Sequence, residues 1–330
     1  MLLRTLFAAS LYAGWVLQFA APVYAQSQDQ TYPARPIKVV VPFPPGGPTD
    51  GMARIISDRL GAVLGQSIIV ENRGGGAGGS VGAKSVATAD PDGYTILMTP
   101  GGSLTTGPAV HKDLGYDPFK DFTPVAKLIE TAQYICVHPS LPVKSLADVA
   151  AFAKASPGKL TWGSQGFGTG THLLSELFKL ETGTSFVHVP YRGTAPMLAA
   201  LLANEIQIAT DPSTTVLPHI QAGNVLPIAV TMPKRTAKLP DVPTTAEAGY
   251  PKMVAAFGLG VVAPAGTPPA VIDKLNAAFR ESLNEPATRA RLDVLGADVS
   301  IGTPQEFGKL LAEEYALWVG VVKAANITVQ

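Results

Sequence analysis

Apolar and polar positions along the chain follow two recurring patterns. Short β-branched runs bounded by glycine or proline are typical of buried strands, and the segments between them repeat apolar residues at the three- and four-residue spacing of amphipathic helices. In the first part of the chain we predict strands at residues 36–42, 67–70 and 94–98 and helices at residues 51–64 and 77–89. Strands that alternate with helices predict an α/β fold with a parallel or mixed sheet covered on both faces.

The same alternation restarts near the middle of the chain. A capping box at Ser145 and Asp148 marks one of the helix starts there. No flexible linker separates the two halves, so both two consecutive lobes and a discontinuous arrangement fit the pattern. The further predicted strands are residues 135–138, 160–164, 186–189, 206–210, 225–230 and 259–262, and the further predicted helices are residues 145–155, 171–182, 196–202, 268–284 and 304–324.

The first 25 residues predict export. A short basic start precedes an uncharged apolar run, residues 6–21, and small residues at Val23 and Ala25 suit a signal peptidase. We expect cleavage after Ala25 and a periplasmic location. A membrane anchor is the alternative, but the run is shorter than the roughly 20 residues that a spanning helix needs, and Gln18 interrupts it.

Composition narrows the function classes. The chain is 46% hydrophobic and 15% charged with a formal net charge of zero, which is typical of a well-packed globular protein and gives no basic excess for binding nucleic acid. The single cysteine, Cys136, excludes an internal disulfide. It lies in the apolar run of residues 134–137, so we expect a buried free thiol.

Three loops share one design, a strand followed by a glycine-bearing turn and a helix start: residues 43–50, 163–172 and 191–196. A helix start carries unpaired backbone N–H groups and a partial positive charge, so it binds anions without a cationic side chain. Thr49 or Asp50 is the expected N-cap in the first loop. These loops are either ordinary capped helix starts or, if they converge, a site for a carboxylate.

Cofactor and catalytic motifs are weak. Gly74, Gly76 and Gly79 match a dinucleotide fingerprint, but the acidic residue expected after the next strand is missing, so we expect no cofactor. No cluster has the spacing of a metal site. Ser164 lacks the surroundings of a nucleophile elbow, and a secreted hydrolase that uses Ser164 with His172 stays a minor alternative.

Motifs along nearly all of the chain after residue 35 resemble those of the Bug receptors, the solute-binding components of tripartite tricarboxylate transporters. The resemblance implies a non-enzymatic, monomeric receptor that passes a small carboxylate, such as a dicarboxylate, a tricarboxylate or an aromatic acid, to a membrane permease. A sensor kinase is the alternative partner. The motifs are PIKVVVPFPPGGPTD at residues 36–50, NRGGG at 72–76, DPDGY at 90–94, YDP at 116–118, HVPYRGTAP at 188–196, PDVPT at 240–244 and APAGTP at 263–268.

The resemblance also implies the architecture and the site. It implies a two-lobed periplasmic binding protein of the Venus flytrap type, type II-like with a crossing-strand hinge: residues 26–127 and 233–330 form lobe 1, and residues 128–232 form lobe 2. Ala203-Asn204 and the proline after Asp211 depart from the family pattern, so the pocket floor is expected to differ. The implied ligand-binding residues are Phe43, Pro45, Gly46, Gly47, Pro48, Thr49, Asp50, Gly101, Ser103, Ser164, Gly168, Thr169, Thr171, His172, Tyr191, Arg192, Gly193, Thr194 and Asp211.

Overall fold

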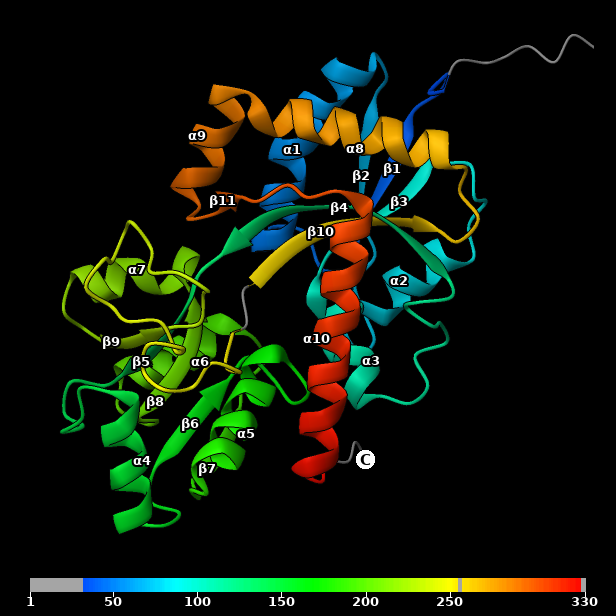
Figure 1. The fold of residues 1–330 in the computed structure, drawn as a ribbon. Coiled ribbons are helices and arrows are strands. Elements are labelled where there is room, and N and C mark those ends of the chain that lie inside the picture. Colours follow the sequence, from blue (N-terminus) through cyan, green and yellow to red (C-terminus); the bar gives the residue numbers. More distant parts are fainter. Residues whose placement is uncertain (1–31, 255–256, 328–330) are drawn as a thin grey trace, which may run out of the picture. The chain divides into compact units, whose positions relative to one another are not determined.

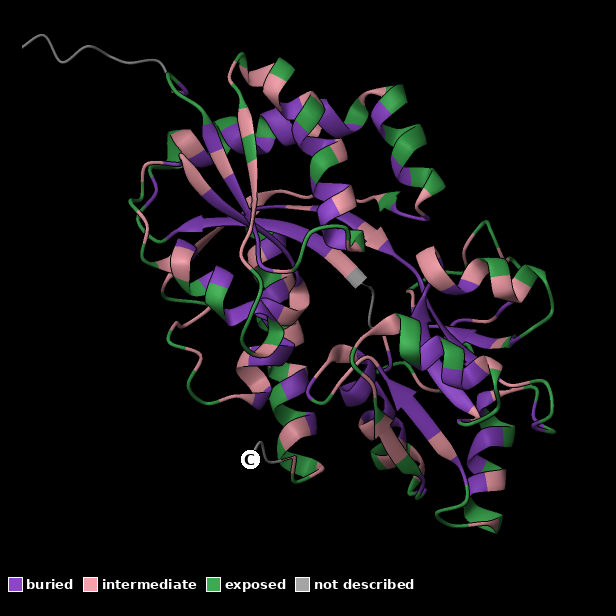
Figure 2. Ribbon diagram, turned by 180° about the vertical axis from the view of Figure 1, so that it is seen from behind, coloured by how far each residue is buried: buried purple, intermediate pink, exposed green. Residues whose placement is uncertain are grey.

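The computed structural model describes residues 32–254 and 257–327, and the described residues from Pro33 onward belong to one compact unit. Two β-sheets with helices packed around them make up this unit (Figure 1). The central strands of both sheets are largely buried (Figure 2). The predicted signal peptide, residues 1–25, lies outside the described residues.

The larger sheet has six strands and is mixed. Its order is β11-β4-β10-β3-β1-β2, in which β1 runs parallel to both neighbours and β10 runs antiparallel to β3 and β4. Helices on both faces explain why β1 and β3 read as nearly continuous apolar runs. The strands are β1 (Ile37–Val41), β2 (Ile68–Asn72), β3 (Thr95–Pro100), β4 (Phe122–Thr131), β10 (Phe257–Pro264) and β11 (Asp298–Val299).

Figure 1 shows α1 and α8 on one face of this sheet and α2 and α10 on the other. Pro48 begins α1, a position where its missing N–H is no loss, and Thr303 and Glu306 begin α10 with a capping box. The helices around this sheet are α1 (Pro48–Leu64), α2 (Ser80–Ala87), α3 (Thr106–Val110), α8 (Pro269–Asn284), α9 (Pro286–Val294) and α10 (Pro304–Ala324); two 3₁₀ turns are η1 (Ala77–Gly79) and η2 (Gly101–Ser103).

The smaller sheet has five strands in the order β7-β6-β8-β5-β9. Strand β6 runs parallel to β7 and β8, whereas β5 runs antiparallel to β8 and β9. As predicted, Ser145 caps α4, because its hydroxyl accepts a hydrogen bond from the Asp148 amide. The elements are β5 (Gln133–Val137), α4 (Leu146–Ala155), β6 (Thr161–Ser164), α5 (Gly170–Thr182), β7 (Val187–Pro190), α6 (Thr194–Leu202), β8 (Ile208–Pro212), α7 (Ser213–Gln221) and β9 (Leu226–Val230).

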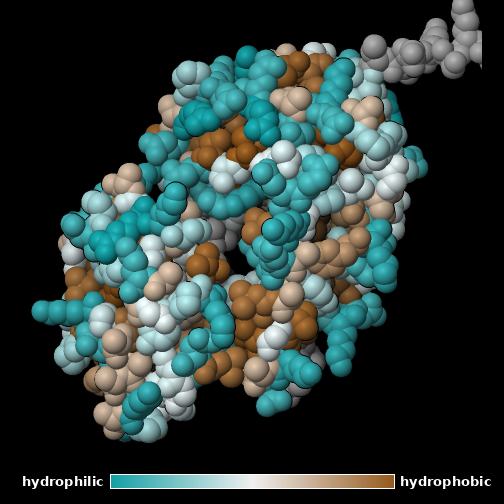
Figure 3. All heavy atoms as spheres, in the orientation of Figure 1, coloured by the Kyte–Doolittle hydropathy of each residue, from teal (hydrophilic) through white to brown (hydrophobic). Residues whose placement is uncertain are grey.

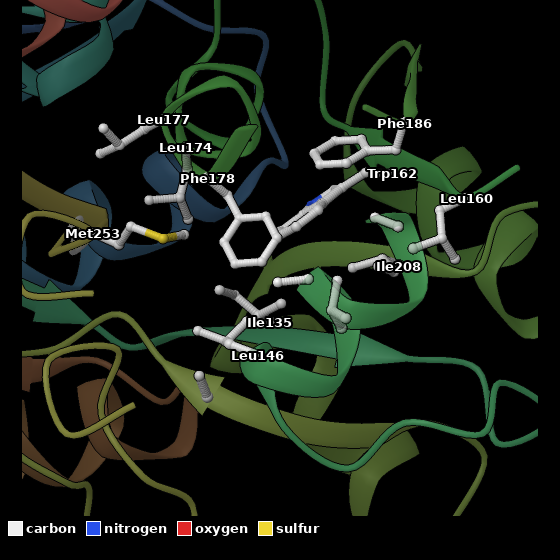
Figure 4. Close-up of a cluster of buried hydrophobic side chains, with 14 of the residues drawn as sticks. Ile135, Leu146, Leu160, Trp162, Leu174, Leu177, Phe178, Phe186, Ile208 and Met253 are labelled. Atoms are coloured by element: carbon white, nitrogen blue, oxygen red, sulfur yellow. The ribbon is translucent and has the colours of Figure 1, made fainter. Parts of the chain in front are cut away.

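Aromatic side chains form the core on one face of the five-stranded sheet (Figure 4). The Trp162 ring lies 5.4 Å from the Phe178 ring and 5.2 Å from the Phe186 ring. Trp162 is completely buried, and its indole N–H donates to the Thr210 hydroxyl, as a buried indole requires. Cys136 is a fully buried free thiol in β5, which confirms the prediction made from its apolar neighbours.

The chain passes from the six-stranded to the five-stranded sheet between β4 and β5. Residues 233–254 pack on the five-stranded sheet: the Thr245 amide donates to the Val230 carbonyl, and Met253 is buried in the same cluster as Trp162. The limits of the two lobes stay a prediction. This packing favours a second lobe that extends to residue 254 over one that ends at residue 232.

The structure adds elements that the hydrophobic pattern did not predict, namely β4, β11, α3, α7 and α9. In β4, Pro124 and two charged residues, Lys127 and Glu130, interrupt the apolar pattern, and its pairing with β10 shifts register twice. In α7, Pro218 lies inside the helix and the sequence is rich in threonine. Period-based prediction fails at such elements because tertiary contacts, and not a local repeat, stabilise them.

Gly260 allows α10 to lie close to the six-stranded sheet. A Cβ added there would lie 2.2 Å from Cζ of Phe307, a buried residue of α10. We expect Gly260→Ala to lower the free energy of unfolding by about 1–3 kcal/mol through overpacking. Phe307→Leu in the same chain should recover part of this loss. Denaturant titration of the two single variants and the double variant checks this, and strictly additive effects would contradict it.

Candidate functional site

A cavity of about 460 Å³ lies between the loops of the two sheets. Figure 3 shows a hollow beside α10 with apolar side chains gathered next to it. A volume of this size suits a small organic ligand. The six-stranded sheet and its helices contribute Phe43, Ala77, Gly78, Pro100–Gly102, Thr105–Gly107, His111, Gly258, Glu314 and Trp318, and the five-stranded sheet contributes Gln133, Gln165 and Phe167–Thr171.

The loop between β6 and α5 forms most of one wall. Thr169 caps α5: its side chain accepts a hydrogen bond from the His172 amide and donates one to the Gly166 carbonyl. The Gly168 amide donates to Nδ1 of His172, which fixes the turn further. Helix geometry leaves the N–H groups of Gly170 and Thr171 without partners inside the helix. This wall therefore presents backbone donors and small side chains.

The third predicted loop supports the second and does not line the cavity. The Tyr191 amide donates to the Ser164 carbonyl, and the Gly193 amide donates to the Gln165 carbonyl. Tyr191, Arg192, Gly193 and Thr194 are thus next to the second loop but outside the cavity lining. Their predicted contact with a ligand stays a prediction.

Only Phe43 of the first predicted loop lines the cavity. Asp50 holds this loop in shape, since its carboxylate accepts hydrogen bonds from the Gly46 amide, Arg54 and Asn72. Burial acts to raise the pKa of Asp50, but these hydrogen bonds outweigh it and lower the pKa below its ordinary value. The other predicted residues of this loop, Pro45, Gly46, Gly47, Pro48, Thr49 and Asp50, lie outside the cavity lining.

Of the two residues predicted after β3, only one lines the cavity. Gly101 lines the cavity, whereas Ser103 is fully buried behind it. The Ser103 hydroxyl donates to the Gly78 carbonyl and accepts from the Thr99 hydroxyl. Ser103 therefore joins the two 3₁₀ turns whose glycines, Gly78 and Gly101, form part of the wall.

Asp211, at the end of β8, is fully buried behind Gln165. Nε2 of Gln165 lies 3.4 Å from its Oδ1, and the Thr215 hydroxyl lies 2.7 Å from its Oδ2. Burial raises the pKa of Asp211 to about 7, although hydrogen bonds from Thr215, Gln165 and Thr194 oppose the rise. Asp211 orients a residue that lines the cavity and does not itself line it.

Ser164 pairs with His188 and not with His172. Its hydroxyl lies 2.6 Å from Nε2 of His188, and His172 stacks on the His188 ring at 3.9 Å. Burial, together with the neighbouring His172 and Lys179, lowers the pKa of His188 to about 3. Ser164 has no exposed surface and does not line the cavity, so the hydroxyl lies away from the space available to a ligand.

Several lining residues lie outside the predicted loops, among them Gln133, Thr105, Glu314 and Trp318. One signal was available for Glu314. The buried residues of α10 are Phe307, Leu311, Trp318 and Val321. Glu314 lies at helical spacing from these residues and therefore on the same face of α10. An acidic residue on an otherwise apolar helix face indicates that the carboxylate has polar surroundings there.

Neither a metal-binding cluster nor a membrane-spanning helix is found among the described residues. In residues 32–254 and 257–327, no group of three or more His, Cys, Asp or Glu side chains is placed to hold a metal ion. No helix in the same residues has both the length and the apolar character that crossing a membrane requires.

The chain matches one receptor family and is similar to known proteins over most of its length. The family described as tripartite tricarboxylate transporter family receptor (TctC) matches residues 52–327. BugT of Bordetella pertussis is 38% identical over 305 residues, which cover 92% of each chain. An R. palustris protein solved with adipate is 38% identical, with a TM-score of 0.78 over 90% of this chain and 99% of that chain.

MatC from Rhodopseudomonas palustris, solved with bound malate, is 35% identical, with a TM-score of 0.75 over 88% of this chain and 100% of that chain. The solved structure of periplasmic binding protein BugD, 34% identical with a TM-score of 0.75 over 91% of this chain and 100% of that chain, confirms the predicted fold class, an α/β periplasmic binding protein fold.

The raised pKa of Asp211 predicts a pH-dependent stability. An aspartate in an unfolded chain titrates near 3.9. Between that pH and about 7 the folded protein retains a proton that the unfolded chain has lost. The free energy of unfolding should therefore fall as pH rises through this window, by up to about 1.4 kcal/mol per pH unit.

Asp211→Asn removes the titrating group, so the variant should gain stability relative to the natural protein as pH rises from about 5 to 8. Denaturant unfolding at both pH values measures the difference. Asp90→Asn, at an exposed aspartate, is the matched control. Parallel pH profiles for Asp211→Asn and the natural chain would contradict the buried, proton-retaining state.

Proposed function

This chain belongs to the tripartite tricarboxylate transporter receptor family, and we propose that it captures a small carboxylate in the periplasm for transfer to a membrane permease. One observation carries the proposal: the N-terminus of α5 lies in the wall of a cavity that both sheets line. Its capped start presents backbone donors, which bind an anion without a charged side chain.

The lining residues support a ligand that neutral donors hold. Among the described residues, no lysine or arginine lines the cavity. The polar residues that do line it are neutral, namely Thr105, Thr106, Thr169, Thr171, Gln133 and Gln165. Relatives solved with adipate and with malate support a carboxylate as the ligand class.

Capture requires the two walls to come together. Val110 and Trp318, which belong to helices of the six-stranded sheet, are buried in the same cluster as Trp162 of the five-stranded sheet. Closing the walls excludes water, and a hydrogen bond to a carboxylate is stronger in the drier surroundings. We propose that an open form binds the ligand on one wall and that closure adds the other.

Export, monomeric state and partner belong to the same proposal. A cleaved leader places the protein in the periplasm, where a permease of the tripartite type is the proposed partner and a sensor kinase is the alternative. Capture of the closed protein by one membrane partner and not the other separates these two.

Gly170→Leu tests the cavity directly. A Cβ at Gly170 would lie 4.0 Å from Cγ2 of Thr106, so a leucine there would project across the cavity without a backbone clash. We expect carboxylate affinity to fall at least about tenfold, which is about 1.4 kcal/mol. Isothermal titration with adipate, malate and short monocarboxylates measures it.

Gly320→Ala is the matched control, because a Cβ at Gly320 meets open space on the exposed side of α10. It should bind as the natural protein does. Unchanged affinity in Gly170→Leu would show that the ligand sits elsewhere, and failure of every carboxylate to bind would reject the proposed function.

The proposal includes the absence of catalysis. Ser164 is buried, and its hydroxyl both donates to the Gly166 carbonyl and accepts from the Gly166 amide, which indicates a role in the loop. We expect no turnover of model esters above that of a Ser164→Ala control, followed by absorbance of the released phenol. Turnover that disappears in Ser164→Ala would favour the hydrolase instead.

A further inference from the structure

Glu314 places a carboxylate in the wall of a cavity that is proposed to hold a carboxylate. It lies on α10, and a Cβ added to Gly101 would be only 3.3 Å from its Oε2. The carboxylate therefore lies over the glycine turn that follows β3. This wall faces the N-terminus of α5 and has the opposite character, because it presents an acceptor.

The groups around Glu314 compensate its charge only in part. Its contact with the Thr105 hydroxyl is 3.5 Å, whereas the same hydroxyl makes a shorter bond of 2.8 Å to the Gly101 carbonyl. A hydroxyl has one proton to donate, so the shorter bond takes it. The Glu314 carboxylate is thus left with a weak neutral donor.

The neighbouring cation is shared. Lys127 of β4 interacts with Glu314 electrostatically and also pairs with Glu130, so one ammonium serves two carboxylates. Burial raises the pKa of Glu314, while Lys127 and Thr105 oppose the rise. His111 also lines the cavity, and burial lowers its pKa, so it adds no positive charge at neutral pH.

When Glu314 is ionised, its partly compensated charge has a direct consequence for the ligand. Two like charges in contact repel, and the repulsion is stronger in a cavity than in bulk water because the effective dielectric constant is lower there. A dicarboxylate with its second group near Glu314 bears that penalty. An ammonium at the same place is attracted instead of repelled. Trp318 and Phe43 also line the cavity, and aromatic side chains favour a cation.

We propose that Glu314 selects a zwitterionic ligand, an amino acid whose carboxylate is held at the N-terminus of α5 and whose ammonium group lies against Glu314. This inference rests on the proposed function and refines its ligand class. It makes Glu314 a specificity-determining residue, which turns the site away from plain dicarboxylates.

Isothermal titration with matched ligands tests this selectivity. The probes are α-amino acids, short ω-amino acids, and the dicarboxylates and hydroxy acids of matching length. We expect the best amino acid to bind at least about tenfold more tightly than its matched dicarboxylate and hydroxy acid. Glu314→Gln, which keeps the shape of the side chain, should reduce that preference at least about tenfold.

Glu313→Gln is the matched control, since Glu313 is 64% exposed on the same helix and pairs with Lys309 outside the cavity. It should keep the full preference. Thermal unfolding of each variant verifies that it is folded. If Glu314→Gln does not fold, the selectivity is judged from the natural protein alone, by whether an amino acid binds more tightly than its matched dicarboxylate and hydroxy acid.

The outcomes separate the two proposals. A dicarboxylate or hydroxy acid that binds at least as tightly as its amino acid match overturns the selectivity, as does a preference that survives in Glu314→Gln. If such ligands still lose affinity in Gly170→Leu, the carboxylate-binding function stands alone. If no probe of any class binds, the proposed function fails and the selectivity fails with it.

Discussion

The packing of α10 between the two sheets is the contact on which the cavity depends. Phe307, near the start of this helix, lies against Gly260 in the six-stranded sheet, whereas Trp318 is buried with Trp162 in the core of the five-stranded sheet. Protein cores are close-packed, so a helix anchored in two of them sets the spacing between their loops. Glu314 lies between the two anchors and consequently faces the space that separates the sheets.

That arrangement gives the cavity two walls of different polarity. The start of α5 contributes backbone N–H groups and threonine side chains, and the middle of α10 contributes a carboxylate. Both act in surroundings drier than bulk water, where electrostatic interactions are stronger. Selectivity in such a site depends on the few polar groups that face the ligand, while glycines and aromatic residues shape the remainder.

Many of the polar residues near the cavity stabilise loops instead of facing a ligand. Asp50 holds the turn after β1, Ser103 joins two 3₁₀ turns, and Ser164 with His188 holds the loop before α5. A buried polar group is costly unless it is hydrogen-bonded, so residues behind the wall must find partners in the protein. Asp211 is an extreme case, since its burial raises its pKa to about 7.

The sequence by itself determined the features that local physics controls. The alternating pattern indicated an α/β fold, the apolar run around Cys136 indicated a buried thiol, and the glycine and threonine residues before α5 indicated a helix start able to hold an anion. Only the tertiary structure decided how much each of the three similar loops contributes to the cavity wall. It also brought Glu314 next to Thr105, 209 residues away in sequence. Such a contact depends on how separate cores pack against one another, and no local repeat encodes it.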